Sequence, residues 1–321
     1  MQRRIFMRRA AALAAAAALP SRGAESFPTH PLTLLVAFAP GGVGDIVARS
    51  VANEASTRLG QTIVIQNRPI PTAAPTTVAR ASPDGYTMML TGNGTTITQA
   101  LFEHLSFDLL RDFRHVTTLA LFDLALLTGA ASRFKGVGDA VAYARANPGK
   151  LNMATVRVGS TQNLAAELFK SAAGIDAVIV PYKATGDVVA ALRTGDADVA
   201  VEIVPPILGM LKANTVRPLA VLSARRFTGL PQVPTLIESG FAGFEVTSWN
   251  GISVPAATPQ PVVEKLGAAF RDAIASPKIQ SDLAAMGITP QAGSSVEMTE
   301  RIRADIKRWQ AVIEKARIPR Q

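Results

Sequence analysis

Four turns in the chain combine residue types that suit the capture of a small anion. They are Pro40-Gly41-Gly42-Val43-Gly44-Asp45, Gly92-Asn93-Gly94-Thr95-Thr96, Arg157-Val158-Gly159-Ser160-Thr161 and Pro181-Tyr182-Lys183-Ala184-Thr185-Gly186. Glycine lets the backbone approach a ligand closely, serine and threonine supply hydroxyls, and arginine and lysine supply cations. Because charge-assisted hydrogen bonds are strong, such a set predicts a site for a small carboxylate.

The same turns also have a purely structural explanation, since Gly, Ser and Thr are common turn and helix-capping residues. The sequence alone leaves Ser160 and Thr161 divided between capping a helix and capping it while contacting a ligand. Lys183 is likewise divided between ligand contact and a solvated surface role. Arg157 is less ambiguous, because it stands between a buried-strand pattern and a helix start. We expect its guanidinium to offer a direct cation to a ligand carboxylate.

Alternating strands and helices must position these turns. Short apolar runs typical of strands occupy residues 32–38, 62–66, 87–90, 151–155, 177–180, 198–203 and 218–222. Most of these runs precede a turn and a helical pattern, and amphipathic helices are expected at 262–274 and 298–316. The alternation predicts an α/β fold, in which ligands bind beyond the carboxyl ends of parallel strands. No Gly/Ser-rich tether separates two halves, which favours two domains joined by strands around a hinge and a ligand cleft.

The composition narrows the chemistry further. The 321 residues are 48% hydrophobic and 18% charged, as in a globular protein, and they include no Cys and only three His, at positions 30, 104 and 115. The lack of cysteine excludes disulfides, thiolate zinc sites, iron–sulfur clusters and cysteine nucleophiles. Isolated histidines leave few residues for a metal site or a serine–histidine pair. We therefore expect no metal, no cofactor and no covalent chemistry.

The N-terminus has the pattern of a cleaved export signal. Four arginines within residues 3–9 precede an apolar run at 10–19 that is too short to span a bilayer, and cleavage is expected between residues 23 and 26. The twin-arginine route and the general secretion route remain equally open. Residues 1–26 carry five Arg and one Glu, so 28 basic and 23 acidic residues remain without a cluster typical of nucleic-acid binding. We expect an exported, periplasmic protein that does not bind nucleic acid.

Two enzymatic alternatives stay open, although no complete motif supports them. Gly41-Gly42-Val43-Gly44 follows a strand but lacks the full dinucleotide-binding spacing, and the next strand ends in Asn67-Arg68 without the acidic residue that holds a ribose. Arg68 could favour a 2′-phosphate, which keeps a Rossmann-like NADP reductase as the weaker alternative. The other is an exported enzyme that uses the same cleft. The chain contains no phosphate-binding G-x-x-x-x-G-K-[ST] loop and no G-x-S-x-G nucleophile turn.

Motifs spread over the whole mature chain resemble one known family. They are Phe38-Ala39-Pro40-Gly41-Gly42 with Asp45, Gln66-Asn67-Arg68-Pro69, Pro83-Asp84-Gly85-Tyr86-Thr87, Asn147-Pro148-Gly149-Lys150-Leu151-Asn152, Pro181-Tyr182-Lys183, Leu230-Pro231, Val233-Pro234-Thr235, Thr247-Ser248-Trp249 and Thr258-Pro259. In this order they resemble the Bug family, the substrate-binding proteins of tripartite tricarboxylate transporters.

The resemblance implies a periplasmic-binding-protein fold of the second type, with domain I at residues 27–125 and 246–321 and domain II at residues 126–245. Such proteins close like a Venus flytrap over small carboxylates, among them dicarboxylic and tricarboxylic acids, acidic amino acids and aromatic acids. The implied partner is a membrane permease, or a sensor protein in some relatives, and we expect a monomer. By position, the resemblance assigns ligand contacts to Phe38, Pro40, Gly41, Gly42, Asp45, Gly159, Ser160, Thr161, Tyr182 and Glu202; the turn analysis adds Asn93 and Arg157.

Four parts of the chain depart from the family pattern, one of them being Ala184, where relatives usually have a glycine after Pro-Tyr-Lys. The stretch Ile70-Pro71-Thr72-Ala73-Ala74 replaces a glycine-rich loop, and Arg157-Val158 replaces a pair of small residues. Asn163 stands where relatives usually have a histidine. Because side chains fill space that glycine leaves free, these departures predict a reshaped pocket.

Overall fold

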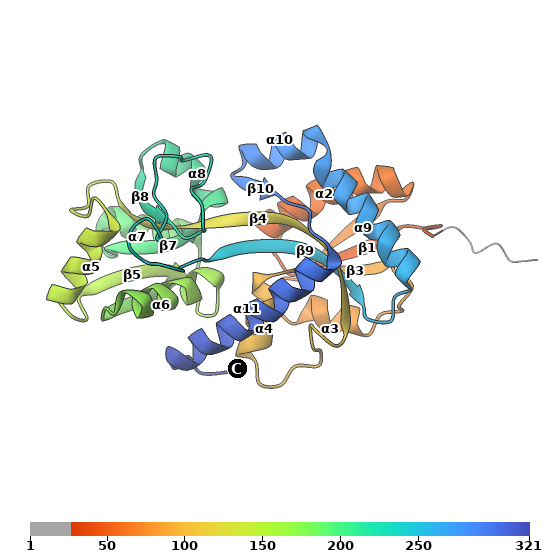
Figure 1. Cartoon of the computed structure of the whole chain (residues 1–321), viewed down its shortest axis with the longest axis horizontal. Coiled ribbons are helices and arrows are strands. Elements are labelled where there is room, and N and C mark those ends of the chain that lie inside the picture. Colours follow the sequence, from red (N-terminus) through yellow and green to blue (C-terminus); the bar gives the residue numbers. More distant parts are fainter. Residues whose placement is uncertain (1–26) are drawn as a thin grey trace, which may run out of the picture.

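The computed structural model describes residues 27–321 as a mixed α/β molecule built on one curved sheet (Figure 1). The elements in chain order are β1 (Leu32–Val36), α2 (Val43–Leu59), β2 (Ile63–Asn67), α3 (Ala73–Ala79), β3 (Thr87–Gly92), α4 (Asn93–Leu101), β4 (Phe113–Gly129), α5 (Val137–Ala146), β5 (Leu151–Val156), α6 (Thr161–Ala173), β6 (Ala177–Tyr182), α7 (Thr185–Thr194), β7 (Val199–Ile203), α8 (Val204–Lys212), β8 (Val216–Val221), β9 (Thr247–Pro255), α9 (Gln260–Ala275), α10 (Pro277–Ala285), β10 (Ile288–Pro290) and α11 (Ser295–Lys315).

The predicted export signal and its cleavage position lie outside the described residues. Within residues 27–321, none of the helices combines the length and the apolar character needed to cross a membrane.

The sheet consists of two parallel groups of strands joined by antiparallel ones. β2, β1 and β3 are parallel neighbours in one half, and β7, β5 and β6 are parallel neighbours in the other. Between them, β9 pairs antiparallel with both β3 and β4, and β4 pairs antiparallel with β7. Figure 1 shows β4 and β9 running from one half of the molecule into the other. The α/β organisation predicted from the alternating strand and helix patterns is confirmed.

Strand β4 belongs to both halves of the sheet. Residues 113–123 pair with β9, while residues 124–128 pair with β7 and residues 125–129 with β8. The register shifts between His115 and Thr117, between Thr118 and Ala120, and again between Leu126 and Leu127. Such bulges increase the local twist of a strand. The sequence pattern did not predict β4, because a 17-residue run is far longer than a usual strand.

Helix α2 illustrates how the sequence sets the packing. Val47, Val51, Ala55 and Leu59 recur at helical spacing and are buried against the first half of the sheet. The helix ends at Gly60, whose φ of 69° is the left-handed conformation that glycine adopts without strain. The apolar spacing and the glycine stop are the local signals that favour a helix at these residues.

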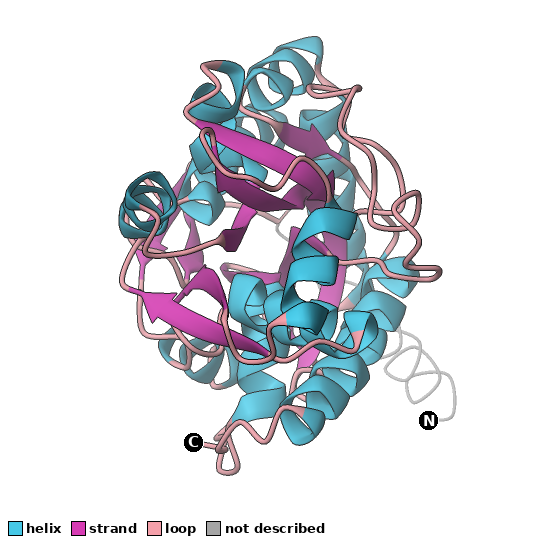
Figure 2. Cartoon of the chain, turned by 90° about the vertical axis from the view of Figure 1, so that its left-hand side faces the viewer, coloured by secondary structure: helices cyan, strands magenta, loops and turns pink. Residues whose placement is uncertain are grey.

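Helices surround the strands, as Figure 2 shows. α4 and α11 pack against each other and connect the two halves. Trp309 and Ile313 of α11 share an apolar core with Ile97 and Leu101 of α4 and with strands and helices of the second half. Burying these side chains stabilises the contact by roughly 1.5–3 kcal/mol for each large group. The C-terminal helix therefore closes the fold, as expected from its amphipathic pattern.

A chain of polar side chains crosses the three central strands of the first half. His115 Nδ1 lies 2.8 Å from Ser253 Oγ, and Ser253 Oγ lies 2.7 Å from Thr91 Oγ1. His115 is 3% exposed and Ser253 is fully buried. This serine–histidine pair has no access to a substrate, so its role is to satisfy polar groups inside the sheet. Burial lowers the pKa of His115 to about 4.

His115 should make the fold sensitive to acid. Because its folded pKa lies below the unfolded value, the stability that it contributes is complete above about pH 6.5 and is lost as the pH falls towards 4. The loss amounts to about 3 kcal/mol. In His115→Asn, which keeps a polar atom near Ser253, the free energy of unfolding should change less between pH 7 and pH 4.5 than in the parent. Urea titrations at the two pH values measure this; exposed His104→Asn is the control. A pH dependence unchanged in His115→Asn would contradict the assignment.

Candidate functional site

The parallel strands of the two halves have their carboxyl ends directed towards each other. β3 runs parallel to β4 and ends at Gly92, which pairs with Asn250 of β9, and Asn250 in turn pairs with Ala120 of β4. β7 runs in the opposite direction and ends at Ile203, which pairs with Leu124 of β4. The end of β3 and the end of β7 are therefore four residue steps apart along β4, from Ala120 to Leu124, which is about 13 Å at the usual rise of a strand. The loops after β1 and β3 face those after β5, β6 and β7 across this interval.

In the first half, Asp45 holds the loop between β1 and α2. Its Oδ2 accepts hydrogen bonds from the Gly41 backbone N–H at 2.9 Å and from Arg49 Nε at 3.0 Å, and its Oδ1 accepts one from Asn67 Nδ2 at 2.7 Å. Asn67 Nδ2 also donates to the Phe38 carbonyl at 3.0 Å. Burial alone would raise the pKa of Asp45, but these hydrogen bonds and the Arg49 charge outweigh it and lower that pKa. The carboxylate braces the loop, with both oxygens already engaged.

The braced loop presents backbone and one aromatic ring. The Phe38 ring lies against Gly44 so closely that a Cβ there would come within 2.5 Å of the ring carbons. Pro40 and Gly41 are exposed, and Gly42 precedes the first turn of α2 with no side chain capping that turn. The unpaired N–H groups at a helix start suit an anion, and glycine keeps the approach open. The nominated Phe38, Pro40, Gly41 and Gly42 thus lie together at the carboxyl end of β1.

Asn93 links the loop after β3 to the crossover strand β9. It is 2% exposed, and its Nδ2 donates to the Thr247 carbonyl at 3.3 Å. Its Oδ1 is buried and has no hydrogen-bond partner within residues 27–321; the same is true of Asn250 Oδ1. Buried polar atoms are usually satisfied, so these two acceptors can take a hydrogen bond from water or from a ligand hydroxyl or amine. The turn motif predicted Asn93, but nothing in the sequence distinguished Asn250.

In the second half, the loop between β5 and α6 is built around a helix cap. Ser160 caps α6 by accepting from the Asn163 backbone N–H at 3.1 Å, and the Gly159 N–H donates to Asn163 Oδ1 at 3.2 Å. Gly159 has a φ of 75°, and a Cβ there would lie 2.8 Å from Leu101 of α4. The loop therefore packs directly against the end of a helix from the first half.

The other nominated residues of this loop differ in exposure. Thr161 is buried in the first turn of α6, while Arg157 and Val158 are exposed, and the part of the chain described in the structure offers Arg157 no side-chain partner. Its guanidinium is therefore available to a ligand. Tyr182, at the end of β6, is partly exposed beside Lys183.

Glu202, at the end of β7, connects three loops of the second half. Its Oε1 accepts from Thr185 Oγ1 at 3.2 Å, and its Oε2 accepts from Gln162 Nε2 at 3.2 Å and from the Ile203 N–H at 3.1 Å. The side chain is fully buried. Burial raises the pKa of Glu202 to about 7, although the hydrogen bonds from Gln162, Ile203 and Thr185 act in the opposite direction. Glu202 is thus a loop brace. Its partner Thr185 belongs to the fourth turn identified in the sequence, whereas sequence reasoning missed its partner Gln162.

Asp123 lies in the interval of β4 that separates the two groups of loops. It pairs with Thr247 of β9, and burial raises its pKa, an effect that Ser223 partly offsets. A carboxyl group beside an anion site is tolerated when it is neutral or paired. The raised pKa values of Asp123 and Glu202 and the Arg49 partner of Asp45 all reduce repulsion of a bound carboxylate.

A family model decides which class of protein this arrangement belongs to. The model of the TctC proteins, described as the tripartite tricarboxylate transporter family receptor, matches residues 47–318. The chain belongs to this receptor family. The resemblance to the Bug proteins is confirmed, and all the motifs that carry it except the first, at residues 38–45, lie within the matched residues.

Similar proteins agree with this family. A protein encoded between tcbD and tcbE in Pseudomonas sp. strain P51 is 33% identical over 92% of this chain and 88% of its own length. The protein BugT of Bordetella pertussis is 29% identical over 90% of each chain.

Solved structures of TctC-type receptors and their relatives superpose well on this chain. The periplasmic binding protein BugD has a TM-score of 0.77 at 27% identity and covers 92% of this chain and 100% of its own. A Rhodopseudomonas palustris protein solved with adipate has a TM-score of 0.79 at 32% identity, covering 90% and 98%. MatC of the same organism, solved with malate, has a TM-score of 0.76 at 30% identity, covering 89% and 100%. These neighbours are solute receptors, and the predicted two-domain binding-protein fold is confirmed.

The raised pKa of Glu202 should affect how the free energy of unfolding depends on pH. Because its folded pKa lies above the unfolded value, its contribution to stability is complete below about pH 4.5 and is lost as the pH rises through 7. Glu202→Gln can keep all three contacts if the Thr185 hydroxyl becomes an acceptor, and it removes the cost of ionisation. The free energy of unfolding of the variant minus that of the parent protein should increase by about 2–3 kcal/mol as the pH rises from 4.5 to 8.

Urea titrations of both proteins across this pH range measure the difference. Exposed Glu314→Gln on α11 is the matched control. If the Glu202→Gln difference did not change with pH, the brace would not carry a raised pKa.

Proposed function

We propose that this receptor binds a small carboxylate between the two groups of loops and releases it chemically unchanged. The observation that carries the proposal is the register of β4, which sets the loops after β1 and β3 opposite those after β5, β6 and β7. These loops offer unpaired N–H groups, hydroxyls and the exposed guanidinium of Arg157. Such donors suit an anion. The adipate and malate in two similar structures support this ligand class.

We assign residues 27–125 and 246–321 to domain I and residues 126–245 to domain II. The change of partner along β4, from β9 up to Asp123 to β7 from Leu124 onwards, supports a boundary near residue 125. A ligand that touches loops of both domains favours the state in which they are close together, by the difference in its affinity for the closed and open states. The ligand-binding residues in this assignment are those nominated from the sequence, with Asp45 and Glu202 acting through the loops that they brace.

We place the receptor in the periplasm and assign delivery of the ligand to a membrane permease of the tripartite tricarboxylate transporter type. The family description and the periplasmic neighbour BugD support this assignment. An enzymatic reaction gains no support from the site. The close serine–histidine pair, His115 with Ser253, is buried within the sheet and away from the facing loops.

Native mass spectrometry of the protein as purified tests the proposal. We expect one equivalent of a small organic acid, released on denaturation and recovered unchanged after prolonged incubation with the protein. A bound nucleotide, or conversion of the acid into another compound, would overturn the receptor assignment.

Arg157 should contribute directly to affinity. With the released acid as ligand, Arg157→Ala should raise the dissociation constant in isothermal titration calorimetry about 10- to 100-fold, the scale of a charge-assisted hydrogen bond. Arg157→Lys keeps a cation but loses the planar guanidinium, so its dissociation constant should lie between those of the parent protein and Arg157→Ala.

Arg80→Ala provides the matched control for this measurement. Arg80 is exposed at the end of α3. There the chain returns to the start of β3, at the amino ends of the parallel strands, whereas the candidate site lies at their carboxyl ends. Equal affinities of Arg157→Ala and Arg80→Ala would show that Arg157 does not touch the ligand.

A further inference from the structure

Two hollows meet on the surface formed by α5, α6 and α11. The first, of about 810 Å³, lies between α5, α6, the loop 239–245 and Arg308 of α11. The second, of about 550 Å³, lies between α6 and α11. Leu168 and Arg308 line both, so the hollows form one continuous depression, called here the α6–α11 groove. None of the nominated ligand contacts lines it, so it is distinct from the candidate site.

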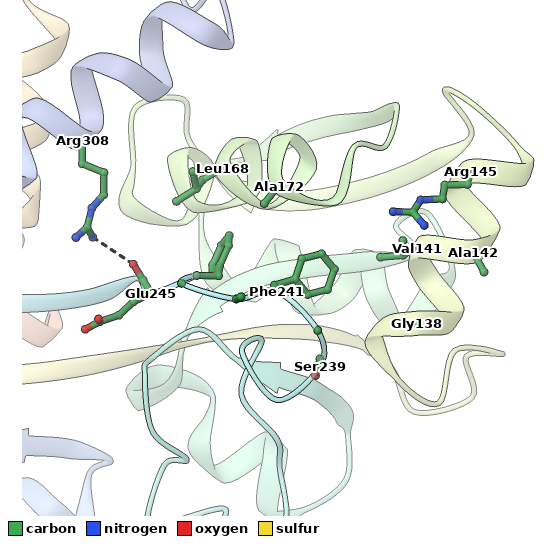
Figure 3. A pocket seen from close by; sticks show the side chains of 14 residues that line it. Gly138, Val141, Ala142, Arg145, Leu168, Ala172, Ser239, Phe241, Glu245 and Arg308 are labelled. Carbon is green, nitrogen blue, oxygen red and sulfur yellow. Dashed lines mark hydrogen bonds between the residues drawn. The ribbon is translucent and has the colours of Figure 1, made fainter.

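The groove has an apolar floor. Figure 3 shows Leu168 and Ala172 of α6 on one side of the first hollow and Phe241 on the other, with Arg308 and Arg145 at its two ends. In the second hollow the apolar lining continues with Ile175, Ala311 and Val312. A floor of this kind, framed by charged groups, suits an amphipathic protein segment.

The charge of the lining is predominantly positive. Five basic residues line the groove, against two acidic ones; they are Arg145, Lys170, Arg308, Lys315 and Arg317, against Glu167 and Glu245. The two arginines of the first hollow keep free N–H groups. Arg145 gives one to the Ala173 carbonyl at 2.9 Å, and Arg308 gives one to the Glu245 carbonyl at 3.2 Å.

Three of the four basic side chains that line the second hollow form no ion pair within residues 27–321, whereas Arg308 lies 3.8 Å from the Asp305 carboxylate. None of the salt bridges within residues 27–321 uses Lys170, Lys315 or Arg317. The lining therefore keeps an excess of cations, and such an excess attracts an acidic partner.

The groove also shares its elements with the candidate site. α6 begins at the Ser160 cap in the site and reaches the groove with its second half, over a helix of about 20 Å. The loop 239–245 leads into β9, which pairs with Asp123 at Thr247. A partner seated across α6 and α11 therefore contacts elements that also position the ligand loops.

We infer that the α6–α11 groove is the docking surface for an acidic, amphipathic segment of the membrane component to which this receptor delivers its ligand. The inference rests on the proposed transport function for the identity of the partner. The carboxylates of the segment pair with the basic rim while its apolar side chains cover Leu168, Phe241 and Val312. An open depression over two helices fits such a segment better than it fits a flat membrane surface.

Site-specific photo-crosslinking in cells of the source organism tests the docking surface. A benzophenone amino acid replaces exposed Ala311 in the groove, and, as the matched control, exposed Ala285 at the end of α10, on the other side of the molecule in Figure 1. We expect a crosslink from position 311 alone, to an integral membrane protein and within an acidic segment of it. Adding Lys315→Glu and Arg317→Glu should reduce that crosslink at least tenfold.

The purified charge-reversal protein separates this inference from the proposed function. Its dissociation constant for the released acid should match that of the parent within twofold. Normal ligand binding without a crosslink at position 311, or with equal crosslinks at 311 and 285, would overturn the docking surface while leaving the receptor function standing. Binding of the parent protein to phosphatidylglycerol vesicles that charge reversal abolishes, in place of a protein crosslink, would also overturn it. A protein that binds no small acid would instead contradict the proposed function.

Discussion

Backbone pairing along the single strand β4 determines where every proposed ligand contact lies. Its residues 113–123 pair with β9 in one half of the sheet and residues 124–128 pair with β7 in the other, so one strand fixes the distance and direction between the two groups of loops. A shift of one residue in either register would turn inward-facing side chains outward. The buried chain from His115 through Ser253 to Thr91 adds side-chain hydrogen bonds between β4, β9 and β3 and so opposes such a shift.

Two carboxyl groups hold the loops at the ends of these strands in place through hydrogen bonds. Asp45 gathers Gly41, Arg49 and Asn67, and Glu202 gathers Gln162, Thr185 and Ile203. A site for an anion that uses acidic residues as internal braces must limit their charge. In the first half the Arg49 guanidinium does so, while in the second half burial favours the protonated form of Glu202. The two halves therefore reach a similar electrostatic result by different means.

The sequence predicted the βα units and the turns after them because each depends on local patterns. Buried parallel strands are continuous apolar runs, and glycine or Ser160 marks a helix boundary within a few residues. β4 escaped prediction because its two parts are buried by different partners and no turn separates them. Gln162, Asn250 and Asp123 were not predicted for another reason: their importance comes from contacts between elements far apart in the chain, as in Gln162 with Glu202. Arg157 was predicted to be available to a ligand, and its exposure is consistent with that role.

The bulges of β4 have a mechanical consequence. Register shifts at Thr118/Ala120 and at Leu126/Leu127 bracket the stretch between the two halves, and over this stretch β4 is accompanied by β9 only as far as Asp123. A short ribbon of this kind resists stretching, because its hydrogen bonds and covalent geometry are stiff, and yields mainly by twisting and bending. Relative movement of the halves is thereby limited to a narrow set of rotations. Rotations of this kind bring the same loops back into alignment without any element having to unfold.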